Sequence, residues 1–209
     1  MVPAEDLTEW KYRAVPGVEV LEGKYARLER LSVAVHSVRG LYDAVVGPVD
    51  ASERFQYMLD AAPKSMDDFM VMMKSKEEAK DRNYFAIIDK SIGVVGGYIA
   101  IQSILPQHGT FEIGSVYMGP SIARGRVATE TIYLLLQYAF SHLNYRRVEW
   151  KCNNDNAKSK AAALRFGFQY EGLFRNHMVS KGLNRNTAWF SMTDDDWATG
   201  VESSYLAWL

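Results

Sequence analysis

The sequence lacks the features that mark disulfide-bonded, membrane-spanning or strongly charged proteins. Its 209 residues include one cysteine, Cys152, so no disulfide can form within the chain. No apolar run approaches the roughly 18 residues of a membrane-spanning helix. With 24 Lys and Arg against 25 Asp and Glu, the net charge of −1 argues against binding of nucleic acid or an anionic membrane by bulk electrostatics. Together with a start that lacks the pattern of a signal peptide, these absences predict a cytoplasmic protein without nucleic-acid or membrane partners.

The length suits one folded domain with short extensions. Residues 1–24 mix aromatic residues, prolines and charges without a steady period, so we expect an irregular N-terminal arm. The domain proper is expected over residues 25–197. Residues 198–209 form a C-terminal tail whose apolar end could dock on the domain or serve a homodimer.

Hydrophobic periodicity predicts an α/β domain. Three successive strands joined by short turns indicate an antiparallel meander, and Gly96-Gly97 in the second of them is typical of a bulge or bend. A strand–helix–strand crossover follows, which predicts two parallel strands. The expected strands are residues 25–31, 84–89, 94–103, 109–118, 147–152, 169–174 and 187–192; the expected helices begin after Ser32 and cover about 33–46, 66–80, 127–143 and 157–166.

A loop bounded by Pro120 and rich in glycine and arginine runs into the third of these helices. Arg124, Gly125 and Arg126 precede the apolar positions that begin at Val127. A helix N-terminus presents unpaired N–H groups and a partial positive charge, so this loop can hold a phosphate. The alternative is an ordinary strand-to-helix turn with solvated charges.

The order of these elements and several local motifs resemble the GCN5-related N-acetyltransferases, and within them the ribosomal-protein alanine acetyltransferases, over about residues 25–197. The motifs are Phe111-Glu112-Ile113-Gly114, residues 120–130, Asn156-Ala157-Lys158-Ser159 with Gly167-Phe168 and Glu171-Gly172, and Trp189-Phe190-Ser191 with Asp196-Trp197. The resemblance implies a mixed, mostly antiparallel central sheet that splays between its fourth and fifth strands and is flanked by helices. It also implies acetyl-CoA as the co-substrate in the gap, with no metal.

The same resemblance assigns residues to the binding of acetyl-CoA. Backbone groups around Tyr117 and Met118 would pair with the pantetheine amides as an added strand does. Asn156 would hydrogen-bond the pantetheine arm from the other side. The pyrophosphate would accept hydrogen bonds from the N–H groups of Arg124, Gly125, Arg126, Val127, Ala128 and Thr129.

The chain departs from the family pattern in two places. In the loop, Arg126 replaces a glycine, so a positive φ is no longer available there at low cost. Ala163 stands where many members carry a tyrosine thought to protonate the leaving thiolate; Ser159, another tyrosine or no residue would take that role. These departures leave open a non-catalytic module that binds acyl-CoA and reports it to a partner.

Direct attack on the thioester requires a neutral amine and a polarised carbonyl. A lysine-like amine with a pKa of about 10.4 costs roughly 4 to 5 kcal/mol to deprotonate at pH 7, whereas an α-amine costs about 1. Glu112 is the best candidate base, acting through a water, although a surface carboxylate is the alternative. His177 is a second candidate base. Backbone N–H groups near Met118 would polarise the carbonyl.

The acceptor is expected to be a primary amine, either a small molecule or a protein N-terminus. Residues 175–186, with Arg175, Lys181 and Arg185, would form part of the acceptor rim and favour an acidic or phosphorylated acceptor. We interpret Cys152 as packing and Glu130 as a partner of the helix dipole. Trp150, Trp189 and Tyr84 would line the acceptor pocket or fill the core.

Overall fold

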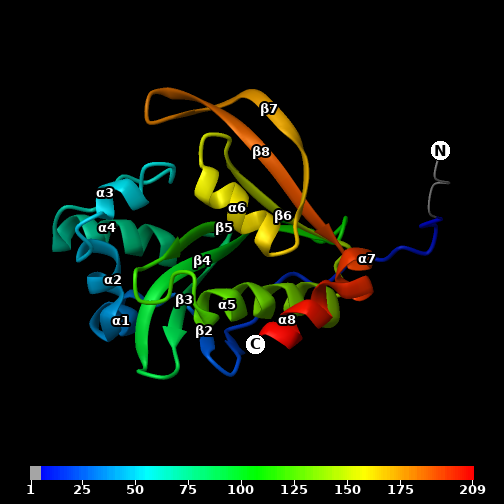
Figure 1. Ribbon diagram of the computed structural model, residues 1–209, viewed down its shortest axis with the longest axis horizontal. Coiled ribbons are helices and arrows are strands. Elements are labelled where there is room, and N and C mark those ends of the chain that lie inside the picture. The colour runs from blue at the N-terminus through cyan, green and yellow to red at the C-terminus, as the bar shows by residue number, and fades with distance from the viewer. Residues whose placement is uncertain (1–5) are drawn as a thin grey trace.

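A single twisted sheet runs through the residues that the structure, a computed structural model, describes, which are 6–209 (Figure 1). The eight strands of this described part follow the order β1-β2-β3-β4-β5-β6-β8-β7, and every neighbouring pair is antiparallel except β5 and β6. The bounds are β1 Val20–Glu22, β2 Ala26–Arg30, β3 Asn83–Asp89, β4 Val94–Leu105, β5 Thr110–Met118, β6 Arg147–Asn153, β7 Gln169–Ser180 and β8 Leu183–Thr193.

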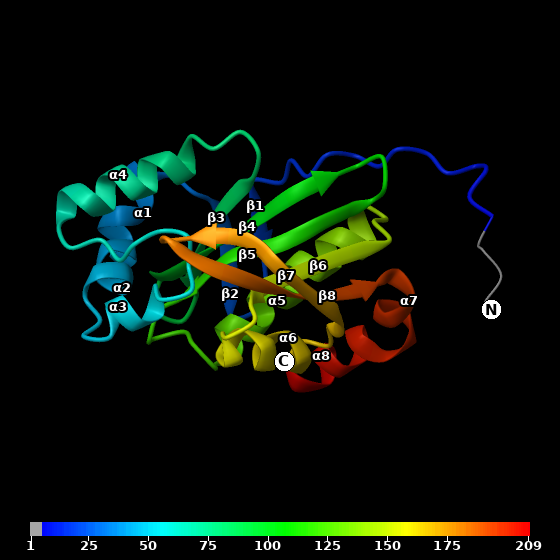
Figure 2. The same cartoon turned by 90° about the horizontal axis from the view of Figure 1, so that it is seen from above.

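Helices cover both faces of the sheet and divide the core into two clusters (Figures 1 and 2). The first four helices pack on one face, while α5, α6 and α8 lie on the other. Within residues 6–209, no helix has the length and apolar character needed to cross a membrane. The bounds are α1 Val33–His36, α2 Tyr42–Val46, α3 Ala51–Arg54, α4 Met66–Glu77, α5 Arg126–Gln137, α6 Ala157–Arg165, α7 Asp194–Asp196 and α8 Glu202–Trp208.

The predicted meander, the parallel crossover and the splay between the fourth and fifth predicted strands, here β5 and β6, are confirmed. The pairing of β5 with β6 covers three positions and ends at Glu112 opposite Glu149. Beyond that point the two strands diverge. A bulge at Gly96, where the register of β3 and β4 shifts, confirms the irregularity expected from the two glycines.

The helix expected over 33–46 is interrupted rather than continuous. Gly40 has φ = +103°, which breaks the helical path between α1 and α2. A Cβ at this position would lie 2.5 Å from Val94 Cγ1, so the glycine also allows the helix to approach β4 closely. Ser32 stands at the N-terminus of α1, but its side chain makes no capping hydrogen bond.

The two extensions of the domain are more ordered than the sequence suggests. The expectation of an irregular arm to residue 24 is wrong at its end, because Val20–Glu22 pairs with β2 as an edge strand; residues 1–5 of that arm lie outside the described residues. The C-terminal tail forms α8, which packs on α5, and the buried Tyr205 donates to the Phe166 carbonyl at 3.1 Å. Both extensions therefore complete the sheet and its helical layer.

The strands β7 and β8 form a long hairpin, where we had expected two short strands and a connecting rim over 175–186. The turn uses Lys181 and Gly182, both with positive φ, as a tight two-residue hairpin turn requires. The tip of the hairpin reaches the N-terminal helices (Figure 2). There Lys181 Nζ donates to the carbonyl of Phe55, the residue that follows α3, at 2.7 Å. The tip of the hairpin thus bridges the sheet and the N-terminal helices.

Glu130 does more than face the helix dipole. Its buried carboxylate accepts backbone N–H bonds from Lys24 at 2.8 Å and from Tyr25 and Ala26 at 2.6 Å. These three bonds attach the β1–β2 turn to α5. A Cβ on Gly23 would lie 2.4 Å from Glu130 Cδ, so the turn closes around the carboxylate only because residue 23 has no side chain.

Replacement of Gly23 by alanine is expected to destabilise the protein by about 2 kcal/mol, because the added methyl group collides with the Glu130 carboxylate. Urea unfolding followed by circular dichroism measures the change. Gly17→Ala is the matched control, since its Cβ would meet nothing closer than Val15 O at 3.8 Å. Equal stability of the two variants would contradict the proposed fit around Glu130.

Candidate active site

The gap between β5 and β6 exposes one edge of β5. Met118 faces this gap, and its carbonyl accepts a hydrogen bond from Arg54 Nη1 at 3.2 Å. Tyr117 does not, because a Cβ on Gly97 of β4 would lie 2.1 Å from Tyr117 O. Of the two residues around which backbone groups were expected at the gap, Tyr117 thus directs its carbonyl to β4, and Met118 directs its carbonyl to the gap. Since the backbone groups of successive strand residues point to opposite edges, we expect Val116 to be the second residue of β5 that faces the gap.

The loop before α5 leaves some of its N–H groups free. Gly125 stands at the N-cap of α5, and its own N–H donates to the Ile122 carbonyl at 3.3 Å. The Thr129 N–H donates to the Gly125 carbonyl at 3.2 Å. These two N–H groups are thus occupied, contrary to our expectation. Among the described residues, no hydrogen bond uses the N–H groups of Arg126, Val127 and Ala128, as is normal for a first helical turn.

The unusual backbone of the loop lies at Arg124 and not at Arg126. Arg124 has φ = +63°, whereas Arg126 is the first residue of α5 and has helical geometry. The side chain at position 126 therefore imposes no backbone strain, and the loss of the family's glycine there is harmless to the loop. Arg124 is exposed, and no ion pair of the described residues uses it.

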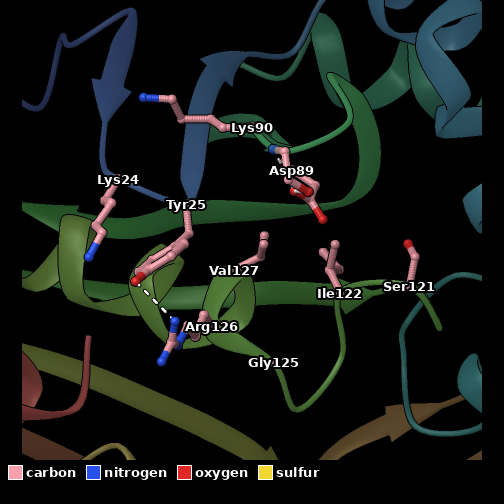
Figure 3. A pocket seen from close by; sticks show the side chains of 10 residues that line it. Lys24, Tyr25, Asp89, Lys90, Ser121, Ile122, Gly125, Arg126 and Val127 are labelled. Carbon is pink, nitrogen blue, oxygen red and sulfur yellow. Dashed lines mark hydrogen bonds between the residues drawn. The ribbon is translucent and has the colours of Figure 1, made fainter.

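The Arg126 side chain points toward Tyr25 of the β1–β2 turn (Figure 3). Its Nη1 donates to Tyr25 OH at 3.1 Å, and its guanidinium lies 5.1 Å from the centre of the Tyr25 ring. Both residues line an open hollow of about 420 Å³ together with Lys24, Asp89 and Lys90. Lys90 is already bound to Glu22 and to the Gly23 carbonyl. Of the two arginines of the loop, Arg124 is thus the one free to meet a ligand in the gap.

On the far side of the gap, α6 begins with a side-chain cap. The polar residues Asp155 and Asn156 are both candidates for this cap in the sequence. Asn156 Oδ1 accepts from the Ser159 N–H at 3.0 Å, so Asn156 is the cap, and its side-chain NH2 group is left for another partner. Ser159 Oγ accepts from Trp150 Nε1 at 3.0 Å, so its hydroxyl lies against β6. Ala163 is fully buried and belongs to the core.

Glu112 is buried, and the interpretation as a surface carboxylate is wrong. Gln102 Nε2 donates to Oε1 at 3.0 Å and Ser103 Oγ donates to Oε2 at 3.0 Å. Lys151 Nζ lies 3.1 Å from Oε2 and 2.7 Å from a carboxylate oxygen of Glu149. The candidate base therefore sits in a polar network across β4, β5 and β6, on the face that the first four helices also cover.

Tyrosine side chains surround this network. Tyr84 OH lies 3.2 Å from Ser115 Oγ, which donates to Gln102 Oε1 at 3.2 Å. Burial raises the pKa of Tyr117 to about 12, and it raises the pKa of Tyr98 as well, so both phenols keep their proton at neutral pH. Tyr117 OH donates to the Ala44 carbonyl at 2.9 Å and is not directed at the gap.

Of the other residues that the sequence suggested for the site, some are exposed or half-buried and some belong to the core. His177 is exposed on β7, with Nδ1 2.9 Å from Thr187 Oγ1. Trp189 is half-buried on the same face as Glu112, with the Lys151 ammonium 4.0 Å from its ring centre. Trp150 and Tyr84 are buried, and Cys152 is buried in the hydrophobic core, as expected of a packing residue; burial also raises the pKa of its thiol.

Comparison with known proteins identifies the family. Residues 42–169 match the family model described as the acetyltransferase (GNAT) domain. A GCN5-related N-acetyltransferase from Brucella melitensis is 42% identical, with a TM-score of 0.93 over 97% of this chain and 90% of that one. A GNAT-family structure from Chromobacterium violaceum is 31% identical, with a TM-score of 0.85 over 95% and 98% of the two chains. The chain belongs to the GNAT family of acetyltransferases.

Other relatives are more distant. The chain is 29% identical to the uncharacterized N-acetyltransferase p20 of Bacillus licheniformis over 131 residues, which are 63% of this chain and 73% of that protein. A spermidine N-acetyltransferase from Vibrio cholerae, solved with CoA and spermine, is 15% identical with a TM-score of 0.63 over 84% and 99% of the two chains. The latter shares the fold alone.

Proposed function

We propose that this protein transfers an acetyl group from acetyl-CoA to a primary amine by direct attack. The observation that carries the proposal is the end of the β5–β6 pairing at Glu112, which opens a strand edge beside the first turn of α5. An unpaired strand edge can accept the pantetheine amides, and a helix N-terminus can accept the pyrophosphate. The distant structure solved with CoA supports the same use of this fold.

The chain's own groups divide the binding between two sides of the gap. Backbone groups of Val116 and Met118 would hold the pantetheine arm on the β5 side, once Arg54 releases the Met118 carbonyl. The amide nitrogen of Asn156 would donate from α6. The N–H groups of Arg126, Val127 and Ala128 would hold the pyrophosphate, with the Arg124 guanidinium as counter-charge.

The proposed reaction places little demand on side chains when the acceptor is an α-amine, since its neutral form is easily reached near pH 7. For an amine of higher pKa, Glu112 would take the proton through a water in the polar network. The tyrosine that would protonate the leaving thiolate is missing at position 163. The Ser159 hydroxyl, which lies against β6, would donate the proton in its place.

We also infer membership of the branch that contains the ribosomal-protein alanine acetyltransferases. Support is limited to the ordered motifs and to a Vibrio cholerae ribosomal-protein-serine acetyltransferase structure that is 17% identical, with a TM-score of 0.69 over 83% and 97% of the two chains. The branch includes acceptors of several kinds, and fold similarity does not choose between them. The single buried cysteine and the balanced charge favour a cytoplasmic location.

Two measurements on the purified protein test the proposal. Calorimetric titration with acetyl-CoA, and separately with CoA, should give near-stoichiometric binding in the micromolar range. Release of free thiol over a panel of amines should then show steady turnover with at least one of them. Binding without turnover on any amine would support the non-catalytic acyl-CoA module, and no binding at millimolar ligand would reject the acetyltransferase activity.

Replacement of Arg124 by glutamate is expected to weaken acetyl-CoA binding by at least about tenfold, because it exchanges a counter-charge for an anion beside the pyrophosphate. Calorimetric titration measures the effect. Lys74→Glu makes the same change of charge on α4, which covers the other face of the sheet, and should leave the affinity unchanged. Unchanged affinity of the Arg124 variant would refute the placement of the pyrophosphate.

A further inference from the structure

Arg185 of β8 is held on the face of the sheet that carries Glu112. Every second side chain of a strand points to the same face, so Arg185 lies on the face of Thr187 and Trp189. Its Nε donates to Thr187 Oγ1 at 3.3 Å, which fixes the root of the guanidinium. The two terminal nitrogens of the group make no further hydrogen bond or ion pair within residues 6–209.

The Arg185 side chain is half-buried, and no carboxylate of the described residues forms an ion pair with it. Burial lowers the pKa of Arg185, while its charge is still within electrostatic reach of Cys152 on β6 and of Glu112 on β5. Arg185 stands two residues before Thr187, which pairs with Asn153 at the end of β6, so Arg185 lies near the carboxyl end of β6. Glu112 lies beyond ion-pair distance from Arg185 and is already bound to Lys151.

Two other arginines of the sheet have carboxylate partners, whereas Arg30 on β2, which is also half-buried and has no carboxylate partner among the described residues, has its guanidinium 5.6 Å from the centre of the Phe85 ring. Arg147 on β6 pairs with Glu149 and Glu171, and Arg27 on β2 pairs with two glutamates. A half-buried cation without a carboxylate costs stability, and such an arrangement is typical of a group that awaits a ligand. The planar guanidinium offers parallel N–H donors that match a carboxylate.

Resting on the proposed acetyl transfer, we infer that Arg185 binds a carboxylate that the acceptor carries near its amine. The carboxylate of such an acceptor would face the cation of Arg185, and its amine would face the anion of Glu112. A polyamine would instead bring a second positive charge toward Arg185 and Lys151. The preferred acceptor class is thus a free amino acid or an acidic peptide N-terminus.

Steady-state thiol release by the full-length protein tests this class with matched amines. One pair is a free α-amino acid and its amide; a second pair is a short peptide with aspartate at its second residue and the same peptide with asparagine. A polyamine completes the panel. The values of kcat/KM are calculated per neutral amine, which removes the difference in pKa between the two members of a pair. The carboxylate member of at least one pair should then have a kcat/KM about 10- to 100-fold higher than its uncharged counterpart. The pair that shows the difference identifies the source of the carboxylate.

The variant Arg185→Gln should abolish that preference by raising KM for the carboxylate member alone, and Arg185→Lys should restore part of it. Arg30→Gln, which removes an arginine from β2, should keep the preference. Calorimetric titration of each variant with acetyl-CoA should give the affinity of the original protein. A protein that binds acetyl-CoA and turns over, but loses activity equally on both members of each pair in Arg185→Gln, overturns the inference and leaves acetyl transfer standing. A preference of the original protein for the amides or the polyamine overturns it as well.

Discussion

Replacement of Glu112 by glutamine is expected to lower kcat on a lysine-like amine by about 100-fold and on an α-amine by far less. The reason is the cost of deprotonation, roughly 4 to 5 kcal/mol at pH 7 for the first amine and about 1 for the second. The variant should fold, because glutamine keeps the shape of the side chain and Lys151 retains Glu149 at 2.7 Å. Thiol release with two amines of different pKa, followed as a function of pH, measures the difference.

Ser103→Ala is the matched control for Glu112. It removes one hydrogen-bond donor to the carboxylate, at 3.0 Å, but leaves the carboxylate itself. Its loss of kcat should stay below about tenfold and should be similar for the two amines. An equal loss on both amines in Glu112→Gln would reject the carboxylate as base and leave it the role of holding Lys151 and β4 beside the gap.

Replacement of Gly97 by alanine is expected to destabilise the protein by about 3 kcal/mol. The new Cβ would lie 2.1 Å from Tyr117 O, a backbone atom that cannot move unless β5 shifts relative to β4. Because Gly97 is opposite Met118 in the sheet, the shift would also displace the strand edge that borders the gap. Urea unfolding measures the first effect, and calorimetric titration with acetyl-CoA measures the second.

The matched control for Gly97 is Gly172→Ala on β7, where an added Cβ would meet nothing within 4 Å. Its free energy of unfolding should stay within about 0.5 kcal/mol of the original value. If the Gly97 variant were equally stable, the close approach of β4 and β5 would be incorrect. The place of the Tyr117 carbonyl would then have to be reconsidered with it.

Local patterns predicted the elements around the site because each depends on neighbouring residues. The crossover from β5 through α5 to β6 followed from a change of period from strand to helix, and a cap at Asp155 or Asn156 followed from polar residues before a helical pattern. Gly96-Gly97 signalled a bulge for the same reason. In each case the physical cause lies within a few residues along the chain.

The details that decide the chemistry depend on residues far apart in the sequence. The N–H group of Arg126 was expected at the pyrophosphate, and its guanidinium is bound elsewhere, by Tyr25 of the β1–β2 turn. A surface carboxylate was the alternative for the candidate base Glu112, but Gln102 and Lys151 from the two neighbouring strands bind its buried carboxylate. No local pattern predicts such partners, because the pairing register and the twist of the sheet select them.

By itself, the sequence determined the order of the elements, the α/β class and the resemblance to the acetyltransferases, because periodicity, turns and short motifs are local. Within residues 6–209, the tertiary structure decided which N–H groups stay free in the first turn of α5, which residues of β5 face the gap and that Arg185 has no ion-pair partner. These properties arise only when distant strands and helices compete for the same donors and acceptors. Pairing removes most such groups from use, and the N–H groups that remain unpaired in the first turn of α5, within the described residues, belong to the proposed site.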